Sequence, residues 1–280
     1  MGTTYILYNP YAGGGKCRSA AEALASDCAD GASLVDMTAV EDYGAFFGGI
    51  TADDRVIVCG GDGTVSRFVN DTDGISIPCD VLYYAAGSGN DFLRDMGKKK
   101  GCEPFSIKDV IKNLPMIHVN GESRRFINGV GLGLDGYCCA EVARAKARGK
   151  SISYVSVALR AFLKEYSPVN ATIVIDGETH KFERVWLVPV MKGKYFGGGV
   201  EAAPMQDRGD ETVTILVMHS VGRLKALFRF PSFLKGKHPK YKKMITVIKG
   251  KSIRVTFDKA TDLQVDGDPI ENVSEYVVEC

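Results

Sequence analysis

Val56-Ile57-Val58-Cys59-Gly60-Gly61-Asp62-Gly63-Thr64-Val65 is a short apolar run that ends in a glycine cluster with one carboxylate at its centre. The run and the turn after it predict a buried strand followed by the start of a helix. Glycines have no Cβ atom, so their backbone N–H groups can approach a phosphate closely, and the positive end of the following helix dipole points the same way. The stretch therefore predicts an anion site.

The carboxylate of Asp62 narrows the chemistry of this site. A carboxylate beside a bound phosphate is repulsive unless it holds a cation, orients a water on one or takes a proton. Asp62 therefore indicates metal-assisted phosphoryl chemistry. The alternative is an ordinary turn between a strand and a helix, in which Gly60, Gly61 and Gly63 only tolerate backbone conformations that other residues rarely adopt.

Length and composition describe an ordinary globular protein. A length of 280 residues favours two domains, and a hydrophobic fraction of 45% is ordinary. The 35 basic residues against 34 acidic ones predict no particular partner. No apolar run is long enough to span a bilayer, and we expect no secretory signal. The eight cysteines form no C-x-x-C pair, so a reduced compartment fits better than a disulfide scaffold or a zinc site.

Two further predicted strands also end in glycine loops. Residues 4–8 lead into residues 9–16, which end in Gly13-Gly14-Gly15-Lys16 but lack the spacing of a P-loop. On its own this loop fits backbone donors near a polyphosphate and a solvated turn equally well. Residues 81–84 lead into Gly87-Ser88-Gly89-Asn90-Asp91. Because open α/β sheets bind ligands at the carboxyl ends of their parallel strands, we expect the three loops to form one site.

These three loops resemble the catalytic domain of diacylglycerol kinases, which is shared with sphingosine and ceramide kinases and with bacterial soluble lipid kinases. The turn at residues 60–64 is the less specific part, because NAD kinases and phosphofructokinases have related turns. Gly87-Ser88-Gly89-Asn90-Asp91-Phe92 is far more specific. Later segments match in the same order, at residues 126–135, 197–204 and 263–268.

The resemblance implies an α/β fold with two domains. An αβα nucleotide-binding domain would span residues 1–122, with residues 270–280 returning to it, and an antiparallel β-sandwich that takes the lipid substrate would span residues 123–269. Short apolar stretches with a period of two, which begin at Ala171, independently favour a sandwich. The implied reaction is transfer of the γ-phosphate of ATP to a lipid hydroxyl with Mg²⁺, diacylglycerol being the first choice of lipid.

Site residues follow from the same resemblance. Those implied at the nucleotide are Asn9, Gly14, Lys16, Thr38, Gly60, Gly61, Asp62, Gly63, Thr64, Ser88, Asn90, Asp91 and Arg94. Arg94 could neutralise phosphate or pair with Asp91, and the pair is the favoured interpretation. Lys98-Lys99-Lys100 is interpreted as a solvated turn. Asp135 and Asp266 would lie at the lipid headgroup.

The catalytic base is predicted at the turn Val265-Asp266-Gly267-Asp268, which by itself is an ordinary hairpin signal. In the family this position usually reads Asp-Gly-Glu, and the last carboxylate is the proposed base for the substrate hydroxyl. Asp268 takes that place here, and Asp62 is the competing candidate. Aspartate is one methylene shorter than glutamate, so the cleft must close further or catalysis is weaker.

A structural metal loop is the last site that the resemblance implies. Asp210 would give a carboxylate oxygen and Asp207 and Thr212 backbone carbonyls, an all-oxygen set that suits Mg²⁺. The sequence has Glu211 where that loop usually has glycine, and His118 where similar kinases place an aspartate of the metal network. Both departures weaken the predicted metal binding.

Residues 213–257 contain no acidic residue, and cations alternate with large apolar residues over residues 223–243. Such a stretch can bind an anionic bilayer surface, or RNA, or it can be a solvated helix face. A lipid substrate favours the bilayer, with Phe230 and Phe233 as expected contacts. We therefore expect a cytoplasmic protein that associates peripherally with membranes and binds no nucleic acid; a homodimer stays open.

Three functions remain open at this stage. The lipid kinase is favoured because of residues 87–94 and the later segments in order. An enzyme similar to NAD kinases is the second choice, and the acceptor of the phosphate would separate the two. The third is a non-catalytic lipid-binding protein, which the departures at His118, Glu211 and Asp268 make plausible.

Overall fold

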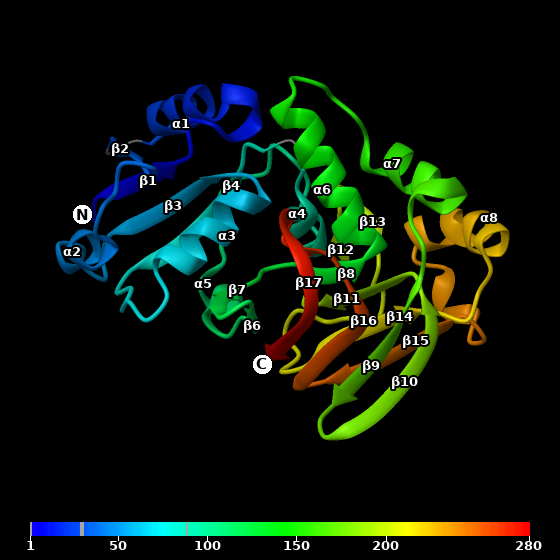
Figure 1. Cartoon of the computed structure of the whole chain (residues 1–280). Helices are drawn as coiled ribbons and strands as arrows, with labels where there is room; N and C mark the ends of the chain where they lie inside the picture. The colour runs from blue at the N-terminus through cyan, green and yellow to red at the C-terminus, as the bar shows by residue number, and fades with distance from the viewer. Residues whose placement is uncertain (1, 29–30, 88) are drawn as a thin grey trace. The chain divides into compact units, whose positions relative to one another are not determined.

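The computed structural model describes residues 2–28, 31–87 and 89–280 of the chain. It divides into two compact units, Met1–Asn113 and Leu114–Cys280 (Figure 1). The division falls before the expected residue 122, because strands β6 (Met116–Val119) and β7 (Glu122–Arg125) form a hairpin that pairs with β17 (Asp268–Glu279). For the same reason residues 270–280 belong to the sheet of the second unit rather than to that of the first.

The first unit is built on one sheet whose first four strands are parallel. Its order is β2 (Ala32–Asp36), β1 (Thr4–Tyr8), β3 (Arg55–Gly60), β4 (Asp80–Ala85) and the antiparallel edge strand β5 (Phe105–Ser106). Residues 56–60 of β3 are all buried, since helices cover both faces of the sheet. The sequence-based expectation of adjacent parallel strands at β1, β3 and β4 is confirmed.

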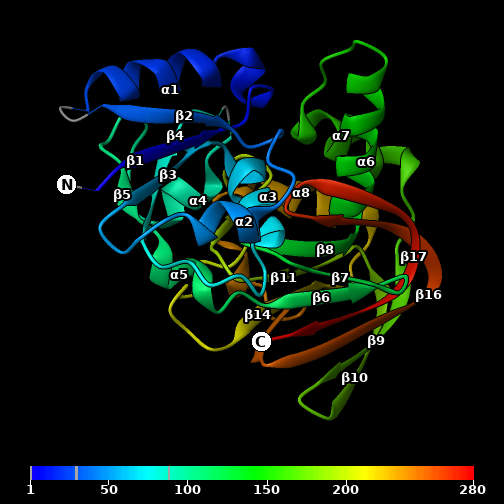
Figure 2. The same cartoon turned by 90° about the vertical axis from the view of Figure 1, so that its left-hand side faces the viewer.

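Two helical layers cover this sheet. The helical elements are η1 (Ala12–Gly15), α1 (Cys17–Ser26), α2 (Tyr43–Gly48), α3 (Asp62–Asp71), α4 (Asp91–Asp95) and α5 (Lys108–Lys112). Helix α1 lies along one face, where Cys17 and Ala21 pack on Ile57 (Figure 2). On the other side, the rings of Tyr43 and Phe68 pack edge to face with centroids 6.3 Å apart.

The second unit is an antiparallel sandwich, as expected from its period-two pattern. Its strands pair in the order β15 (Ile245–Gly250), β14 (Val213–Met218), β11 (Leu187–Met191), β8 (Gly129–Gly133), β16 (Ser252–Val265), β17, β6 and β7, while β9 (Val169–Ile175) pairs with β16 and with β10 (Glu178–Val185). A short ribbon of β12 (Tyr195–Phe196) and β13 (Val200–Glu201) is separate. The long strand β16 pairs with β9 in its first half and with β8 in its last residues, with register shifts between, so it joins the two layers.

Helices cover one face of the second sheet and create a second core. They are α6 (Leu134–Ala147), α7 (Tyr154–Arg160), a π-helical turn η2 (Ala161–Glu165), α8 (Arg223–Leu234) and η3 (His238–Lys240). Strand β14 separates the cores: Ile215 points into the sandwich, whereas Leu216 packs with Trp186 beneath the helices. Among the described helices, none combines the length and the hydropathy of a membrane span.

Candidate functional site

The three glycine loops of the first unit pack directly on one another. Backbone N–H groups of Ala86 and Gly87 donate to the carbonyl oxygen of Gly60 at 2.9 and 3.1 Å. A Cβ atom on Gly87 would lie 2.4 Å from the Cα of Gly61, and one on Gly13 would lie 2.7 Å from the carbonyl oxygen of Ala86. Since the backbones are this close, side chains are excluded at Gly87 and Gly13.

A cavity of about 430 Å³ opens between the first and third loops. Its lining is Gly13, Lys16, Ala20, Tyr84, Ala85, Ala86, Gly87, Lys100 and Gly101. The volume is in the range of small-molecule sites, and two ammonium groups beside glycine backbones favour an anionic ligand. Lys16 was predicted at this place from the sequence.

Lys100 is a site residue that the sequence interpretation missed. Its Nζ donates to the carbonyl oxygen of Gly87 at 3.2 Å, so the lysine run is not simply a solvated turn. In the same run, the Nζ of Lys98 lies 5.6 Å from the centre of the Phe105 ring. The sequence carries no signal for this contact, because it depends on the return of the chain after α4 to the carboxyl end of β4.

Asp62 joins the second loop to the third. Its Oδ2 accepts a hydrogen bond from the backbone N–H of Asp91 at 2.8 Å, and its Oδ1 accepts one from Phe92 at 3.1 Å. Two charge-assisted bonds to the first turn of α4 fix the position of that helix. Asp62 is therefore a positioning residue between the loops, which weakens its case as the catalytic base.

The third loop carries the more specific part of the motif. The Nδ2 group of Asn90 donates to the carbonyl oxygen of Gly87 at 3.2 Å, while its buried Oδ1 has no partner among the described residues. Arg94 lies 3.4 Å from the Asp91 carboxylate, which confirms the favoured ion pair. Ser88, predicted to contact nucleotide phosphates, lies outside the described residues.

Other predicted nucleotide residues shape the loops. The side chain of Asn9 accepts from the backbone N–H of Tyr11 at 3.0 Å, which turns the chain into the first loop. Thr64 is buried, and its Oγ1 accepts from the N–H of Gly61 at 3.3 Å. A Cβ atom on Gly60 would clash with the Thr64 side chain. Gly14 has a positive φ of 68° in the first loop, and Gly63 is exposed.

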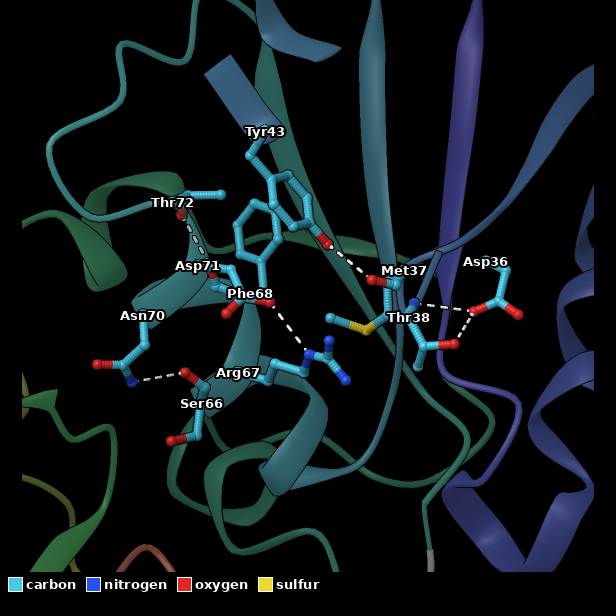
Figure 3. Close-up of polar contacts among 10 residues, drawn as sticks. All are labelled: Asp36, Met37, Thr38, Tyr43, Ser66, Arg67, Phe68, Asn70, Asp71 and Thr72. Atoms are coloured by element: carbon cyan, nitrogen blue, oxygen red, sulfur yellow. Dashed lines mark hydrogen bonds and ion pairs between the residues drawn. The ribbon is translucent and has the colours of Figure 1, made fainter. Parts of the chain in front are cut away.

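Thr38 follows β2 in a turn closed by Asp36 (Figure 3). Both its N–H and its Oγ1 donate to the Asp36 Oδ1, at 2.8 and 2.7 Å. Nearby, the hydroxyl of Tyr43 donates to the carbonyl oxygen of Met37 at 3.4 Å. The contacts give Thr38 a structural role in this turn, and its predicted contact with the nucleotide stays a prediction.

In the second unit, Asp266 anchors the hairpin that presents Asp268. The Asp266 carboxylate accepts from the backbone N–H groups of Ile127, Asn128 and Gly129 at 2.7, 2.9 and 3.1 Å. Its φ of +50° closes the turn between β16 and β17. These three bonds hold the Asp266 carboxylate against the backbone of residues 127–129 and stabilise the turn. The predicted contact of Asp266 with the lipid headgroup stays a prediction.

Asp268 is the first residue of β17, and its side chain is exposed to solvent. Its side chain is 74% exposed, and its Oδ2 lies 3.5 Å from Nη1 of Arg124. Arg124 also donates to the carbonyl oxygen of Val265 at 3.3 Å, so one guanidinium holds both sides of the turn. The Asp268 carboxylate is therefore accessible to a ligand, and its role as the base stays a prediction.

Asp135, which the resemblance places at the lipid headgroup, is completely buried, and its contact with a headgroup stays a prediction. Burial raises the pKa of its carboxyl to about 7. Neither oxygen makes a hydrogen bond of good geometry among the described residues, and the same holds for the Tyr166 hydroxyl and the Gln264 amide nitrogen, although Gln264 is close enough to lower the pKa of Asp135. A Cβ atom on Gly131 would lie 1.5 Å from Oδ2 of Asp135, so glycine there lets the carboxyl fold back over β8.

Comparison with protein-family models identifies both units. Residues 3–117 match the model described as the diacylglycerol kinase catalytic domain, and residues 128–278 match the YegS C-terminal NAD kinase beta sandwich-like domain. The chain belongs to the family of the YegS C-terminal domain, and its first unit matches a diacylglycerol kinase catalytic domain. The two matches follow one another along the chain in the order that the resemblance implied, a catalytic domain and then a sandwich domain.

Individual relatives of this family are similar over most of the chain. A Bacillus subtilis protein, YtlR, whose name describes it as a candidate lipid kinase, is 27% identical over 237 residues, which are 76% of this chain and 74% of its own. A diacylglycerol kinase of Mycobacterium tuberculosis is 26% identical over 222 residues, 77% and 70% of the two chains. The family and these names point to a lipid kinase.

A solved structure supports the fold directly. The crystal structure of a diacylglycerol kinase from Bacillus anthracis superposes with a TM-score of 0.68 at 22% identity, covering 99% of this chain and 94% of that one. At this identity the likeness shows the fold alone. The mixed α/β fold with an antiparallel sandwich is therefore confirmed.

The metal loop implied by the resemblance does not fit a cation in this family member. The Gln206 amide donates to the carbonyl oxygens of Asp207 and Thr212 at 2.7 and 3.0 Å, the two carbonyls predicted as metal ligands. The Asp210 carboxylate pairs with the ammonium of Lys249, and the Asp210 carbonyl accepts from Lys192 at 2.6 Å. No group of three or more metal-binding side chains occurs in the described part of the chain.

Donor groups of the protein itself contact the oxygens of this loop, where the prediction placed a cation. The assignment of Asp207, Asp210 and Thr212 as metal ligands stays a prediction, which these contacts disfavour because an amide and two ammonium groups already contact the oxygens that would bind Mg²⁺. These contacts could not be predicted from the sequence, because no motif links a glutamine or a lysine far along the chain to the oxygens of this loop.

We expect Gln206→Ala to lower the free energy of unfolding by about 1–3 kcal/mol, because two carbonyls and the Thr214 hydroxyl lose their partner. Urea denaturation measures this loss. Glu211→Ala on the same loop is the matched control, since that side chain is 84% exposed and should leave the midpoint unchanged. Added EDTA should not change the melting temperature of the wild type; a clear decrease would show that the loop holds a metal.

Proposed function

We propose that the chain is an ATP-dependent lipid kinase that transfers the γ-phosphate of ATP to a lipid hydroxyl, with diacylglycerol as the first acceptor to test. One observation carries the proposal. In a family of lipid kinases, three glycine loops pack into a single platform beside a cavity lined by Lys16 and Lys100. Phosphoryl transfer depends mainly on positioning and on neutralising charge, which backbone donors and ammonium groups provide.

In this proposal the polyphosphate lies on the glycine loops, with the two lysines near its oxygens. Mg²⁺ bound to the phosphates would neutralise charge that develops on them. Asp62 keeps the second and third loops in register through its bonds to Asp91 and Phe92. Asn90 offers a buried, unpartnered acceptor oxygen to a ligand donor.

Asp268 is the proposed general base. Its carboxylate takes the proton of the lipid hydroxyl as the hydroxyl oxygen forms a bond to the γ-phosphorus, and the bond from that phosphorus to the bridging β–γ oxygen breaks. The products are a lipid phosphate and ADP. Arg124, at 3.5 Å, orients the Asp268 carboxylate on the exposed hairpin.

Asp135 remains a proposed contact of the lipid headgroup, but as a buried one. Its two orphaned oxygens, with the unpartnered Tyr166 hydroxyl and Gln264 amide nitrogen, would be satisfied by a ligand hydroxyl. Gln264 pairs with Gly131 on the neighbouring strand, directly beneath the Asp135 carboxyl. A headgroup would have to enter between α6 and the sheet to reach it.

An acceptor panel tests the function. Purified protein with radiolabelled ATP and Mg²⁺ is incubated separately with diacylglycerol, sphingosine, ceramide and NAD, and incorporation into each acceptor is measured. We expect label in a lipid, with diacylglycerol strongest. Label in NAD alone would favour an enzyme similar to NAD kinases, and no label in any acceptor would contradict the proposal.

Lys100, which lines the cavity, is expected to contribute to ATP binding. Lys100→Ala should raise the KM for ATP about tenfold, the effect of losing one hydrogen bond to a charged group. Lys99→Ala is the matched control, because Lys99 belongs to the same run and does not line the cavity. Steady-state kinetics at saturating lipid measures both. Equal KM values for the two variants would remove Lys100 from the nucleotide site.

A further inference from the structure

Two neighbouring helical segments of the second unit expose apolar side chains in register. On α7 and η2 these are Val155, Leu159 and Leu163, which are 38%, 40% and 59% exposed at a spacing of four residues. On α8 they are Leu224 and Phe228, 67% and 79% exposed, at the same spacing. Residues four apart share one face of a helix, so each segment presents an apolar stripe to solvent.

The same helices already bury another face, so the stripes are not needed for the core. Ala226, Phe230 and Phe233 of α8 are buried, and the ring of Phe230 lies 5.1 Å from that of Phe162 in η2. Five of the eight large hydrophobic residues that are exposed in the described chain lie on these two segments. Such a concentration marks an interaction surface rather than scattered exposure.

The two segments are in direct contact, so their stripes form a single surface. The guanidinium of Arg223, at the start of α8, donates to the carbonyl oxygens of Ala161 and Phe162 at 3.1 and 3.0 Å. Figure 1 shows α7 and α8 as neighbours in the second unit. We call this surface, made of residues 155–164 and 224–229, the α7–α8 face.

A basic residue comes directly after four of the five exposed apolar residues. Arg160 and Lys164 follow Leu159 and Leu163, and Lys225 and Arg229 follow Leu224 and Phe228; all four are exposed. The acid on these segments is Glu165, which lies 3.8 Å from Arg160 and accepts from the Tyr137 hydroxyl at 3.2 Å. Arg229 lies over the Tyr241 ring at 4.4 Å, and Lys240 of η3 lies 5.2 Å from the centre of the same ring. The face is therefore apolar with a positive border.

We propose that the α7–α8 face docks on the surface of an anionic lipid bilayer. The aliphatic and phenyl side chains would enter the boundary of the acyl chains, and the cations would pair with lipid phosphates, each contributing about 1 kcal/mol before screening by salt. This inference deepens the proposed function and rests on it, because a kinase of bilayer lipids must reach its substrate at the membrane surface.

The observations favour a bilayer over two other occupants. RNA is bound by stacking on aromatic rings, and Phe228 alone among the five exposed apolar residues is aromatic. A second copy of the chain would bring two positive borders together, which repel. The match between a positive border and anionic lipid headgroups supports the membrane.

The structure also corrects which side chains would contact lipid. Phe230 and Phe233, expected from the sequence, are each only 3% exposed and pack inside the second core. Removing them would destabilise α8 instead of testing docking. Leu224 and Phe228 lie on the opposite, exposed face of the same helix and replace them as the expected contacts.

Vesicle sedimentation with the full chain tests the proposal. Wild type should bind vesicles that contain phosphatidylglycerol and should bind pure phosphatidylcholine vesicles weakly. The double variant Leu224→Ser with Phe228→Ser should bind the anionic vesicles at least about tenfold more weakly, with an unchanged melting temperature. Leu34→Ser, an exposed leucine of the first unit, is the matched control and should bind as wild type does. Unchanged binding by the double variant overturns the proposal.

A second arm tests the charges and separates the docking from the kinase activity. Lys164→Glu with Lys225→Glu should weaken binding to anionic vesicles and reduce the dependence of that binding on salt.

With a short-chain diacylglycerol dissolved as monomers, the Leu224 and Phe228 double variant should keep wild-type activity and lose it only on vesicles. Vesicle binding without phosphorylation of any lipid would contradict the proposed function alone. Failure of wild type to bind anionic vesicles, or tighter binding to RNA than to vesicles, would contradict the docking alone.

Discussion

Replacing Asp268 by Asn should lower kcat for lipid phosphorylation by about 10²–10⁴-fold and leave the KM for ATP nearly unchanged, because an amide cannot accept the hydroxyl proton. The Asp268 side chain is exposed at the start of β17, and Arg124 holds it without burying it. Steady-state kinetics with varied ATP and saturating lipid separates the two parameters. Glu271→Gln on the same strand is the matched control and should leave kcat unchanged.

A companion variant tests whether the short aspartate limits catalysis. Asp268→Glu restores the residue that the family usually has at this position, and the longer side chain can reach further toward a substrate hydroxyl. We expect it to keep or raise kcat. A kcat for Asp268→Asn equal to that of wild type would eliminate Asp268 as the base.

Asp62→Asn should act differently, through the geometry of the loops. An asparagine has one acceptor oxygen, so its NH₂ group would face one of the two N–H donors of Asp91 and Phe92. We expect a loss of stability on the order of 1–3 kcal/mol and a tenfold to hundredfold fall in kcat/KM for ATP, expressed mainly in KM. Thermal melts and kinetics at varied ATP measure the two effects.

The control for this variant lies at the other end of the same helix. Asp71→Asn affects an ion pair with Arg67 (Figure 3) in which the two side chains are 35% and 45% exposed, so the melting temperature and the kinetics should stay close to wild type. A pure loss of kcat in Asp62→Asn, with normal KM and stability, would restore Asp62 as the competing candidate for the base.

The strand, glycine loop and helix units could be predicted because two independent signals agree on them. Apolar runs that end in glycine clusters define β1, β3 and β4 locally, and the topology of parallel sheets then brings their loops together. The clash that a Cβ atom on Gly87 would make with Gly61 shows how strictly this packing requires glycine. The sandwich followed in the same way from its period-two pattern.

Features that depend on contacts between distant residues could not be predicted. Lys100 reaches the cavity only because the chain returns to Gly87 after α4. The Gln206 amide contacts the carbonyl oxygens of Asp207 and Thr212, and no spacing rule describes these contacts. In α8 the apolar residues are not confined to one face, so the sequence does not tell which face packs on Phe162, and the exposed Phe228 and buried Phe230 were not distinguished.

Transfer of phosphate from ATP to lipid is most directly tested by comparing ATP labelled at the γ-phosphate with ATP labelled at the α-phosphate. Each is incubated with the purified full chain, Mg²⁺ and diacylglycerol vesicles, and label is counted in the chloroform-extracted lipid. We predict that γ-label appears in the lipid in proportion to the ADP formed and that α-label stays in the aqueous phase. ATP bound to the protein with no γ-label in any extracted lipid would contradict the assignment as a lipid kinase.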